Sequence, residues 1–517
     1  MTGKGIDKIT IEVICNRIRT IAELMGEILV KSSFSANIKE RRDCSTAVFD
    51  GRGRLVAQAE HIPLHLGSMM GTALEIIARF GPNIYPGDVF ICNDPYAGGT
   101  HLPDVTLVTP YFREGKLENF AANIAHHSDI GAAQAGGISG NARTIFEEGL
   151  RIPPVRLMKK GHLDKGLMDL IVTNCRMPAE RETDLRAQIA TNGMGLKYLE
   201  QVYDKYSPSA VRRSMEEQLS YTHRRLAKKI QEIPEGSYSF EDWLDDDGVT
   251  EEPIPIKVCL RAFGKKLEFD FTGTGPQSKG ALNVVRSALM ATIFYTVKAF
   301  LDPRLAANAG MERAISIKTP KLSIVDPRPP AAVGARTDTC QRIAGTIIGA
   351  FNKALPHKAV AGSNDASTAV VFSKENEFVY VEAVGGGSGA STEGDGLDGV
   401  QVHITNTSNL PVEVLENEFP LRINRYAFLP GSGGEGRFKG GLGLIREIEV
   451  LQPDISFSSH ADRHKYKPWG WAGGKAGKAG SFMLDGKRMP SKNSGITLAK
   501  NSTITIKTPG GGGFGEK

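Results

Sequence analysis

The sequence lacks the long apolar runs of membrane proteins and the processing segment of secreted ones. Its longest apolar stretch, residues 284–301, contains Arg286 and Lys298, which predicts a buried helix and no membrane span. The first turns are charged, and no apolar run there leads to a small-residue cleavage site. We therefore expect a cytoplasmic chain with no membrane partner.

Cysteine is scarce, and its spacing excludes two common uses. The six cysteines stand at positions 15, 44, 92, 175, 259 and 340. No Cys-x-x-Cys pair is available for a zinc ribbon or a thioredoxin-type centre. We expect buried thiols in a reducing compartment, and Cys92, within an apolar run, is predicted to be inert packing.

The chain also lacks an excess of charge of either sign. It has 63 Lys and Arg against 58 Asp and Glu, a formal net charge of +5, and 7% aromatic residues. This balance excludes a dedicated nucleic-acid binder. The hydrophobic content of 40% is that of an ordinary globular protein and excludes a disordered chain.

Glycine is abundant, with 58 among 517 residues, above the usual share of about 7%. Many backbone positions must therefore need positive φ or close approach. The glycines are dense in the last third, from residue 360 onward, where the sequence also favours strands. We predict a mixed α+β fold in which an N-terminal α/β region, 1–230, precedes a mixed and Gly-rich β region, 231–517.

Hydrophobic periodicity places the main elements. Apolar side chains at Ile14, Ile18, Ile21, Met25 and Ile28 form one stripe, which predicts a helix packed on a core. An Asp-Gly-Arg-Gly turn at 50–53 predicts a hairpin with arms 46–49 and 54–57. Further strands are predicted at 89–92, 105–108, 120–125 and within 238–272, and helices at 66–80, 184–230, 281–301 and 342–355.

Histidine is concentrated in one short part of the chain. Five of the eleven histidines lie between positions 61 and 127, namely His61, His65, His101, His126 and His127. His101 and Asp104 stand three residues apart in a turn-rich loop, and His126 ends the neighbouring predicted strand. Such a His/Asp/His set meets the ligand count of a catalytic metal site with one open position, and Asp43 could add a fourth ligand. The spacing alone is equally compatible with hydrogen-bonded core histidines and Asx turns.

Two further polar residues follow His126 directly. His127 and Asp129 are candidates for catalytic roles, either by orienting a metal ligand or as a general acid/base. Ordinary loop polarity is the alternative.

Two glycine-rich segments resemble nucleotide-binding motifs but do not match them. Residues 473–479 lack the first Gly and the Ser or Thr of a phosphate loop. No apolar helix follows the G-x-G-x-x-G at 431–436, so that segment is predicted to be a turn between strands.

Longer motifs extend over nearly the whole chain. In the N-terminal half they are Asn37-Ile38-Lys39-Glu40-Arg41, His61-Ile62-Pro63-Leu64-His65-Leu66-Gly67-Ser68-Met69, Asn93-Asp94-Pro95-Tyr96, Gly98-Gly99-Thr100-His101-Leu102-Pro103-Asp104-Val105 and Ala125-His126-His127-Ser128-Asp129. In the C-terminal half they include Asn406-Thr407-Ser408-Asn409, Pro411-Val412-Glu413, Pro468-Trp469-Gly470 and Thr508-Pro509-Gly510-Gly511-Gly512-Gly513. With these motifs the sequence closely resembles the hydantoinase B/oxoprolinase family.

The resemblance implies a site, a cofactor and a partner. The family's metal ligands correspond to His101, Asp104 and His126, with Asp43 as a fourth, and the metal would be one divalent ion, Zn, Mn or Fe. ATP would be used by a separate hydantoinase A-type, kinase-like subunit in a hetero-oligomer. One departure is Arg181-Glu182-Thr183-Asp184, where the family has Arg-x-Gly-Asp.

The expected function is that of the hydrolase subunit of an ATP-dependent cyclic-amide hydrolase. The partner would phosphorylate the carbonyl oxygen of a hydantoin, 5-oxoproline or lactam, and a metal-bound hydroxide would then open the ring. One alternative is the metal subunit of an ATP-dependent ketone carboxylase. Another is a non-catalytic scaffold for the kinase-like partner.

Overall fold

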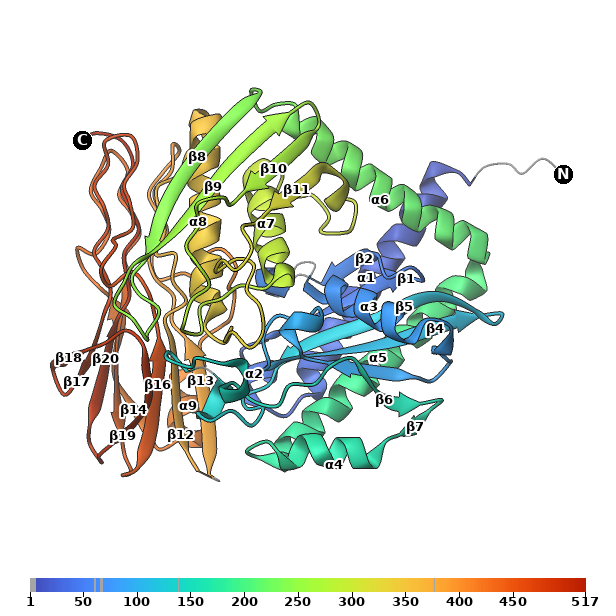
Figure 1. Cartoon of the computed structure of the whole chain (residues 1–517), viewed down its shortest axis with the longest axis horizontal. Helices are drawn as coiled ribbons and strands as arrows, with labels where there is room; N and C mark the ends of the chain where they lie inside the picture. Colours follow the sequence, from blue (N-terminus) through green and yellow to red (C-terminus); the bar gives the residue numbers. More distant parts are fainter. Residues whose placement is uncertain (1–5, 60–61, 66–67, 138, 376) are drawn as a thin grey trace.

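The protein has a mixed α+β fold, as predicted, in a computed structural model that describes residues 6–59, 62–65, 68–137, 139–375 and 377–517 (Figure 1). The helices are α1 (Lys8–Ser32), α2 (Ala36–Lys39), α3 (Ser68–Phe80), α4 (Lys165–Thr173), α5 (Pro178–Lys205), α6 (Pro208–Ile230), α7 (Arg286–Leu301), α8 (Arg336–Ala354) and α9 (Val412–Glu418). None of the helices in these ranges is both long and apolar enough to cross a membrane.

The strands form four sheets within the described ranges. They are β1 (Cys44–Asp50), β2 (Leu55–Ala59), β3 (Val89–Cys92), β4 (Asp104–Arg113), β5 (Lys116–His126), β6 (Val155–Lys159), β7 (His162–Leu163), β8 (Gly236–Leu244), β9 (Ile254–Phe263), β10 (Lys266–Asp270), β11 (Ile315–Lys318), β12 (Ala369–Lys374), β13 (Phe378–Ala383), β14 (Leu421–Phe428), β15 (Leu444–Val450), β16 (Ile455–His460), β17 (Ser481–Leu484), β18 (Lys487–Met489), β19 (Asn493–Leu498) and β20 (Thr503–Lys507). The orders are β2-β1-β5-β4-β3-β6-β7, β11-β10-β9-β8, β13-β12-β16-β19 and β14-β15-β20-β17-β18.

The seven-stranded sheet is buried on both faces along its central strands, β1, β5, β4 and β3. α1 and α5 pack on one face, and α3 packs on the other. Successive side chains point to opposite faces, so Val48 joins the α1 cluster whereas Phe49 joins the large central cluster. This explains why every residue of β1 is buried. The predicted hairpin is confirmed, since β1 and β2 pair in antiparallel fashion around the 50–53 turn.

The first helix follows its predicted stripe with one exception. Asp7 caps α1 by accepting hydrogen bonds from the backbone N–H groups of Ile9 and Thr10, both at 3.0 Å. The first four stripe residues are buried, but Ile28 is only half-buried and Leu29 is fully buried instead. The contact surface therefore turns toward Leu29 at the end of the helix.

Two central helices connect the sheets, and both begin at positions that differ from the prediction. α7 and α8 pack against each other, and α8 packs on β8 and β9. α7 starts at Arg286 and not at Ala281. α8 starts at Arg336, six residues before the predicted Arg342, because its polar first turns are buried and engage ion-pair partners from distant strands.

The C-terminal third is built from the remaining two sheets, coloured orange to red in Figure 1. Glycine lets its loops pack backbone to backbone: a Cβ on Gly511 would lie 1.8 Å from the carbonyl oxygen of Ser388. The 431–436 segment lies between β14 and β15, which confirms the predicted turn between strands.

The predicted boundary near Gln231 stays a prediction. The largest apolar cluster contains side chains from both sides of it, among them Phe120, Leu289 and Ile343.

Candidate metal centre

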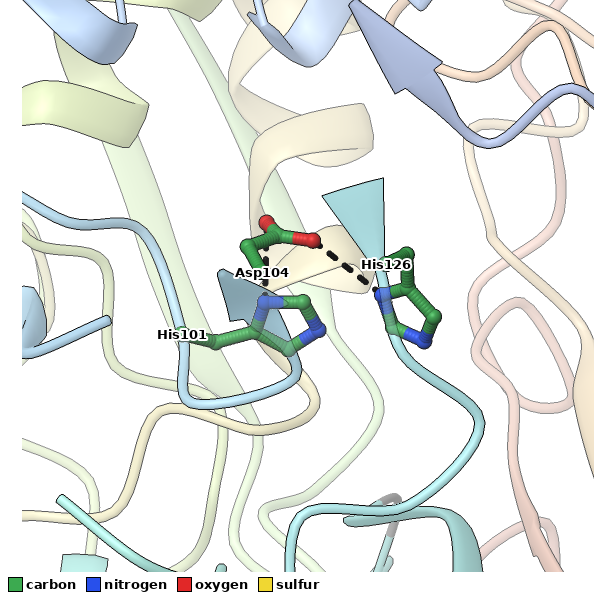
Figure 2. A group of neighbouring side chains, drawn as sticks. All are labelled: His101, Asp104 and His126. Atoms are coloured by element: carbon green, nitrogen blue, oxygen red, sulfur yellow. Dashed lines mark hydrogen bonds and ion pairs between the residues drawn. The ribbon is translucent and has the colours of Figure 1, made fainter. Parts of the chain in front are cut away.

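A loop and a strand end bring three predicted ligands together. β4 begins at Asp104, β5 ends at His126, and the antiparallel register places the two residues opposite each other. His101 lies in the loop three residues before Asp104. Figure 2 shows the three side chains turned toward one another.

The loop that carries His101 is fixed on both sides. The side-chain nitrogen Nδ2 of Asn93 donates hydrogen bonds to the carbonyl oxygens of Leu102 and Leu150 at 2.8 and 2.9 Å. Gly98 has φ +93°, and a Cβ there would lie 2.2 Å from the carbonyl carbon of Gly71 on α3. Only glycine allows this approach, so the loop is held against α3.

The three side chains form a compact and buried group. Nδ1 of His101 lies 2.9 Å from Oδ2 of Asp104, and Nδ1 of His126 lies 3.1 Å from Oδ1 of the same carboxylate. One ligand atom from each residue lies within 4.8 Å of the others. His101, Asp104 and His126 are 3%, 1% and 7% exposed.

The donor set fits a divalent transition metal. Nδ1 of His101 is buried without a hydrogen-bond partner among the described residues, although a carboxylate oxygen lies 2.9 Å away. This unpartnered nitrogen lies beside a carboxylate that also contacts His126, so one ligand atom from each residue can face one ion. Two imidazoles and a carboxylate are ligands that suit Zn²⁺, Mn²⁺ or Fe²⁺.

The electrostatics keep His101 and Asp104 in the protonation state that binds metal. Burial, with the nearby Arg336 guanidinium, lowers the pKa of His101 to about 3, so its imidazole is neutral at pH 7. Burial alone would raise the pKa of Asp104, but His101 and Arg336 hold it well below its usual range. Nη2 of Arg336 lies 2.7 Å from Oδ2 of Asp104, and the Thr100 hydroxyl donates to the same oxygen.

The predicted fourth ligand, Asp43, lines the same cavity as the three other residues. Its backbone carbonyl oxygen accepts a hydrogen bond from the N–H of His126 at 2.9 Å, so it precedes β1 next to the end of β5. Its carboxylate is not among the atoms gathered within 4.8 Å. Its role as a ligand stays a prediction.

The two predicted catalytic residues are not among the residues that line this cavity. Nε2 of His127 lies 2.9 Å from Oε1 of Gln188 on α5. The Asp129 carboxylate accepts hydrogen bonds from the N–H of Arg176 at 2.7 Å and of Gly131 at 2.9 Å. The catalytic roles of both residues stay predictions.

Sequence reasoning missed several residues that line the cavity. His65 belongs to the predicted histidine group without an assigned role; its Nδ1 lies 3.1 Å from the Ser45 hydroxyl. His61 lies outside the described residues. Arg336 and His460 also line the cavity, and no local spacing could connect them with residues more than 200 positions earlier.

Together, the fold and the site define a class of protein: a mixed α+β chain with a buried His/Asp/His centre between two antiparallel strands. The sequence matches the family described as hydantoinase B/oxoprolinase over residues 7–517. The chain therefore belongs to the hydantoinase B/oxoprolinase family.

Its relatives differ in length. An uncharacterised protein of Methanocaldococcus jannaschii is 38% identical, with 99% of this chain and 91% of that protein covered. A Pseudomonas protein named as a putative B-type subunit of a D-/L-hydantoinase is 32% identical, covering 99% and 90%. 5-Oxoprolinase 1 of Arabidopsis thaliana is 33% identical over 98% of this chain, which spans only 42% of that longer protein.

Two solved structures share the fold. The ATP-dependent caprolactamase of Pseudomonas jessenii superposes with a TM-score of 0.92 at 26% identity, covering 99% of this chain and 92% of that chain. An acetone carboxylase chain superposes with a TM-score of 0.90 at 17% identity, covering 98% and 76%. The second likeness shows the fold alone.

Proposed function

We propose that this chain is the ring-opening subunit of an ATP-dependent cyclic-amide hydrolase. The observation that carries the proposal is the buried His101/Asp104/His126 group, whose ligand atoms lie within 4.8 Å of one another and include a His101 Nδ1 without a hydrogen-bond partner among the described residues. The proposal is supported by relatives named as a 5-oxoprolinase and a hydantoinase subunit and by the structural likeness to a caprolactamase.

One divalent ion, Zn, Mn or Fe, would be held by His101, Asp104 and His126, with Asp43 as the fourth ligand. Such an ion lowers the pKa of a bound water and so supplies a nucleophile near neutral pH. The residues around it have separate tasks. Arg336 and Thr100 hold the Asp104 carboxylate in place. His127 orients the strand end that carries His126 through its contact with α5, and Asp129 anchors the loop that follows to Arg176.

Room for the substrate lies beside the metal site. The cavity at the three ligands measures about 70 Å³, which is room for a few water molecules. It shares Thr407 with a cavity of about 670 Å³, a size typical of small-molecule sites. We assign the body of the cyclic amide to this larger cavity, with its carbonyl directed toward the metal site.

ATP would be used by a kinase-like partner subunit of the hydantoinase A type. The support is the name of the Pseudomonas relative, a B-type hydantoinase component of nearly the same length as this chain. The partner would place a phosphoryl group on the carbonyl oxygen, because an amide nitrogen is a poor leaving group until the carbonyl is activated. The phosphorylated ring would then be opened on this chain.

The test is a reconstitution with the partner and a panel of cyclic amides. We expect about one divalent ion per chain, no substrate-dependent ATPase from this chain alone, and ring-opened product together with phosphate when both subunits are present. Bicarbonate-dependent product from a ketone would favour the carboxylase alternative. A complex that turns over without stoichiometric metal on this chain would favour the scaffold alternative.

A further inference from the structure

A second histidine–carboxylate pair lines the wall of the metal cavity. His460, the last residue of β16, lines the cavity and is 1% exposed. Its Nδ1 lies 2.6 Å from Oδ2 of Asp338 on α8, a carboxylate that is itself fully buried. His460 is not one of the three residues whose ligand atoms converge.

The pair fixes the orientation of the imidazole. Asp338 also accepts a hydrogen bond from the backbone N–H of Ser367 at 2.8 Å, so the carboxylate has a second anchor. Because Nδ1 of His460 is turned to this carboxylate, the ring is held with Nδ1 protonated, and Nε2 is left to face a molecule in the cavity. No hydrogen bond to Nε2 occurs among the described residues. An imidazole held in this way by a carboxylate is a common arrangement for a general base.

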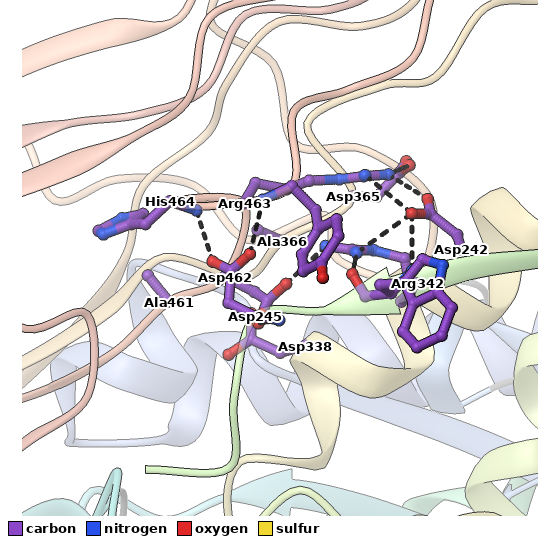
Figure 3. Close-up of polar contacts among 12 residues, drawn as sticks. Asp242, Asp245, Asp338, Arg342, Asp365, Ala366, Ala461, Asp462, Arg463 and His464 are labelled. Carbon is purple, nitrogen blue, oxygen red and sulfur yellow. Dashed lines mark hydrogen bonds and ion pairs between the residues drawn. The ribbon is translucent and has the colours of Figure 1, made fainter. Parts of the chain in front are cut away.

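The surroundings keep Asp338 anionic. Burial alone would raise the pKa of Asp338, but His460 and the ammonium group of Lys492 hold it below its usual range. Behind it lie Asp245, Asp462 and Arg342, members of a buried charged group at the end of β8, on α8 and after β16 (Figure 3). On the cavity side, the charged groups that line the wall with His460 are Arg41, Asp43, Asp104, Arg336 and Glu382.

The same helix serves both sides of the cavity. Arg336 reaches Asp104 of the metal centre, and two residues later Asp338 reaches His460. The first turn of α8 therefore holds the metal-binding side and the imidazole side in a fixed relation.

We infer that His460, oriented by Asp338, is the residue that moves protons during ring opening. The inference rests on the proposed function. When a cyclic amide phosphorylated at its carbonyl oxygen is opened, the oxygen of one water bonds to the carbonyl carbon, the carbon–nitrogen bond breaks with its electron pair on nitrogen, and both water protons end on that nitrogen. Nε2 of His460 takes each proton from oxygen and gives it to nitrogen. The first products are an acyl phosphate and an amine, and His460 is neutral again. A second water then hydrolyses the acyl phosphate, which gives the carboxylate and the phosphate that the assay measures.

The first test uses His460→Ala in the complex with the kinase-like partner, assayed with 5-oxoproline, ε-caprolactam and hydantoin. The surface variant His357→Ala is the matched control, since His357 is exposed. We expect His460→Ala to retain its metal and its partner and to lose ring opening by about 10²- to 10⁴-fold in kcat with little change in KM. Added imidazole should restore part of the rate in His460→Ala. A near-normal rate, a loss of metal, or a rate that imidazole does not restore would each overturn the inference.

The second test needs neither substrate nor partner. In spectra of the metal-loaded chain labelled with ¹⁵N-histidine, the His460 signals, assigned by their loss in His460→Ala, should show a protonated Nδ1. Asp338→Asn should change that signal and lower kcat without rescue by imidazole. An unchanged His460 signal in Asp338→Asn would refute the orienting role even if no cyclic amide proved to be a substrate, so this failure can be told from failure of the proposed function.

Discussion

At the scale of single residues, the candidate metal centre brings two imidazoles and one carboxylate together in a buried position. His101, Asp104 and His126 lie within 26 positions of sequence; their spacing fitted a metal site and hydrogen-bonded core histidines equally, and the family resemblance favoured the metal site. Arg336 and His460 could not be predicted in this way, because only the packing of α8 and β16 brings them to the cavity. Local spacing picks out candidate ligands, but long-range packing determines which residues surround them.

Substitutions of Asp43 and Asp129 distinguish an aspartate that binds the metal from one that only stabilises a loop. Asp43 lines the cavity, whereas Asp129 hydrogen-bonds Arg176 and Gly131 outside it. We predict that Asp43→Asn weakens metal affinity by about 10- to 100-fold, while Asp129→Asn changes it little and lowers the melting temperature instead. Competition with a chelator of known affinity measures both, and equal affinities in the two variants would remove Asp43 from the ligand set.

At the scale of elements, patterns with a clear period were predicted well and buried polar segments were not. The hairpin at β1 and β2 and the three strands β3, β4 and β5 follow from alternation and turn residues. The start of α8 was missed because Arg336-Thr337-Asp338-Thr339 resembles a polar loop. Its charges are buried only because Asp104 pairs with Arg336 and His460 hydrogen-bonds Asp338 from elsewhere in the chain.

The loop before β4 offers a direct test of how it positions His101. Gly98→Ala combines positive φ with a Cβ placed 2.2 Å from the Gly71 backbone, whereas Gly115 has a similar φ and nothing within 4 Å of the added Cβ. We predict that Gly115→Ala costs about 1 kcal/mol and that Gly98→Ala costs about 2–5 kcal/mol and weakens metal binding. Denaturant unfolding and metal titration check this, and equal effects of the two substitutions would contradict it.

The loop directly before α8 is held by a carboxyl group, Glu148, whose protonation changes near neutral pH. Glu148 accepts hydrogen bonds from the N–H groups of Val333 and Gly334, and burial raises its pKa to about 7. Its folded-state pKa is above the value of about 4.3 expected when unfolded. The contribution of protonated Glu148 to the free energy of unfolding is therefore complete below the unfolded-state pKa of about 4.3, and it is lost as the pH rises through 7.

We predict that, between pH 5 and pH 8, the melting temperature of the wild type falls relative to that of Glu148→Gln, because a glutamine side chain cannot ionise. Glu147→Gln, one position away in the turn at Thr144, is the control and should follow the wild type. Parallel curves for wild type and Glu148→Gln would show that Glu148 does not titrate in this range.

At the scale of the whole molecule, a buried charged group joins the C-terminal sheets to the central helices (Figure 3). Arg463, which follows β16, contacts Asp242 of β8 at 2.7 Å and also Asp365. Arg342 of α8 lies 2.6 Å from Asp462. Since a buried charge without a partner is costly, these contacts require the two parts of the chain to fold together.

The stabilising effect of this charged group is tested by comparing two neighbouring cations, Arg463 within the group and Lys465 near the surface. Arg463→Met removes the nearest cation from two buried carboxylates, which then keep only His403 at Asp365 and Arg342 at Asp242, and it should destabilise the fold by about 3–5 kcal/mol. Lys465→Met removes a half-exposed ion pair with Asp246 and should cost at most about 1 kcal/mol. Denaturant unfolding of both variants measures the difference, and similar small losses would show that the charged group does not connect the two parts.

The measurement that tests the central claim most directly is the ratio of ring-opened product to phosphate released by the complex of His101→Ala with its kinase-like partner, with assembly checked by gel filtration. Loss of one ligand should remove the metal and stop ring opening, while phosphorylation on the partner continues. The account predicts that ATP is consumed without matching product. A product-to-phosphate ratio equal to that of the wild type, at a near-normal rate, would contradict it.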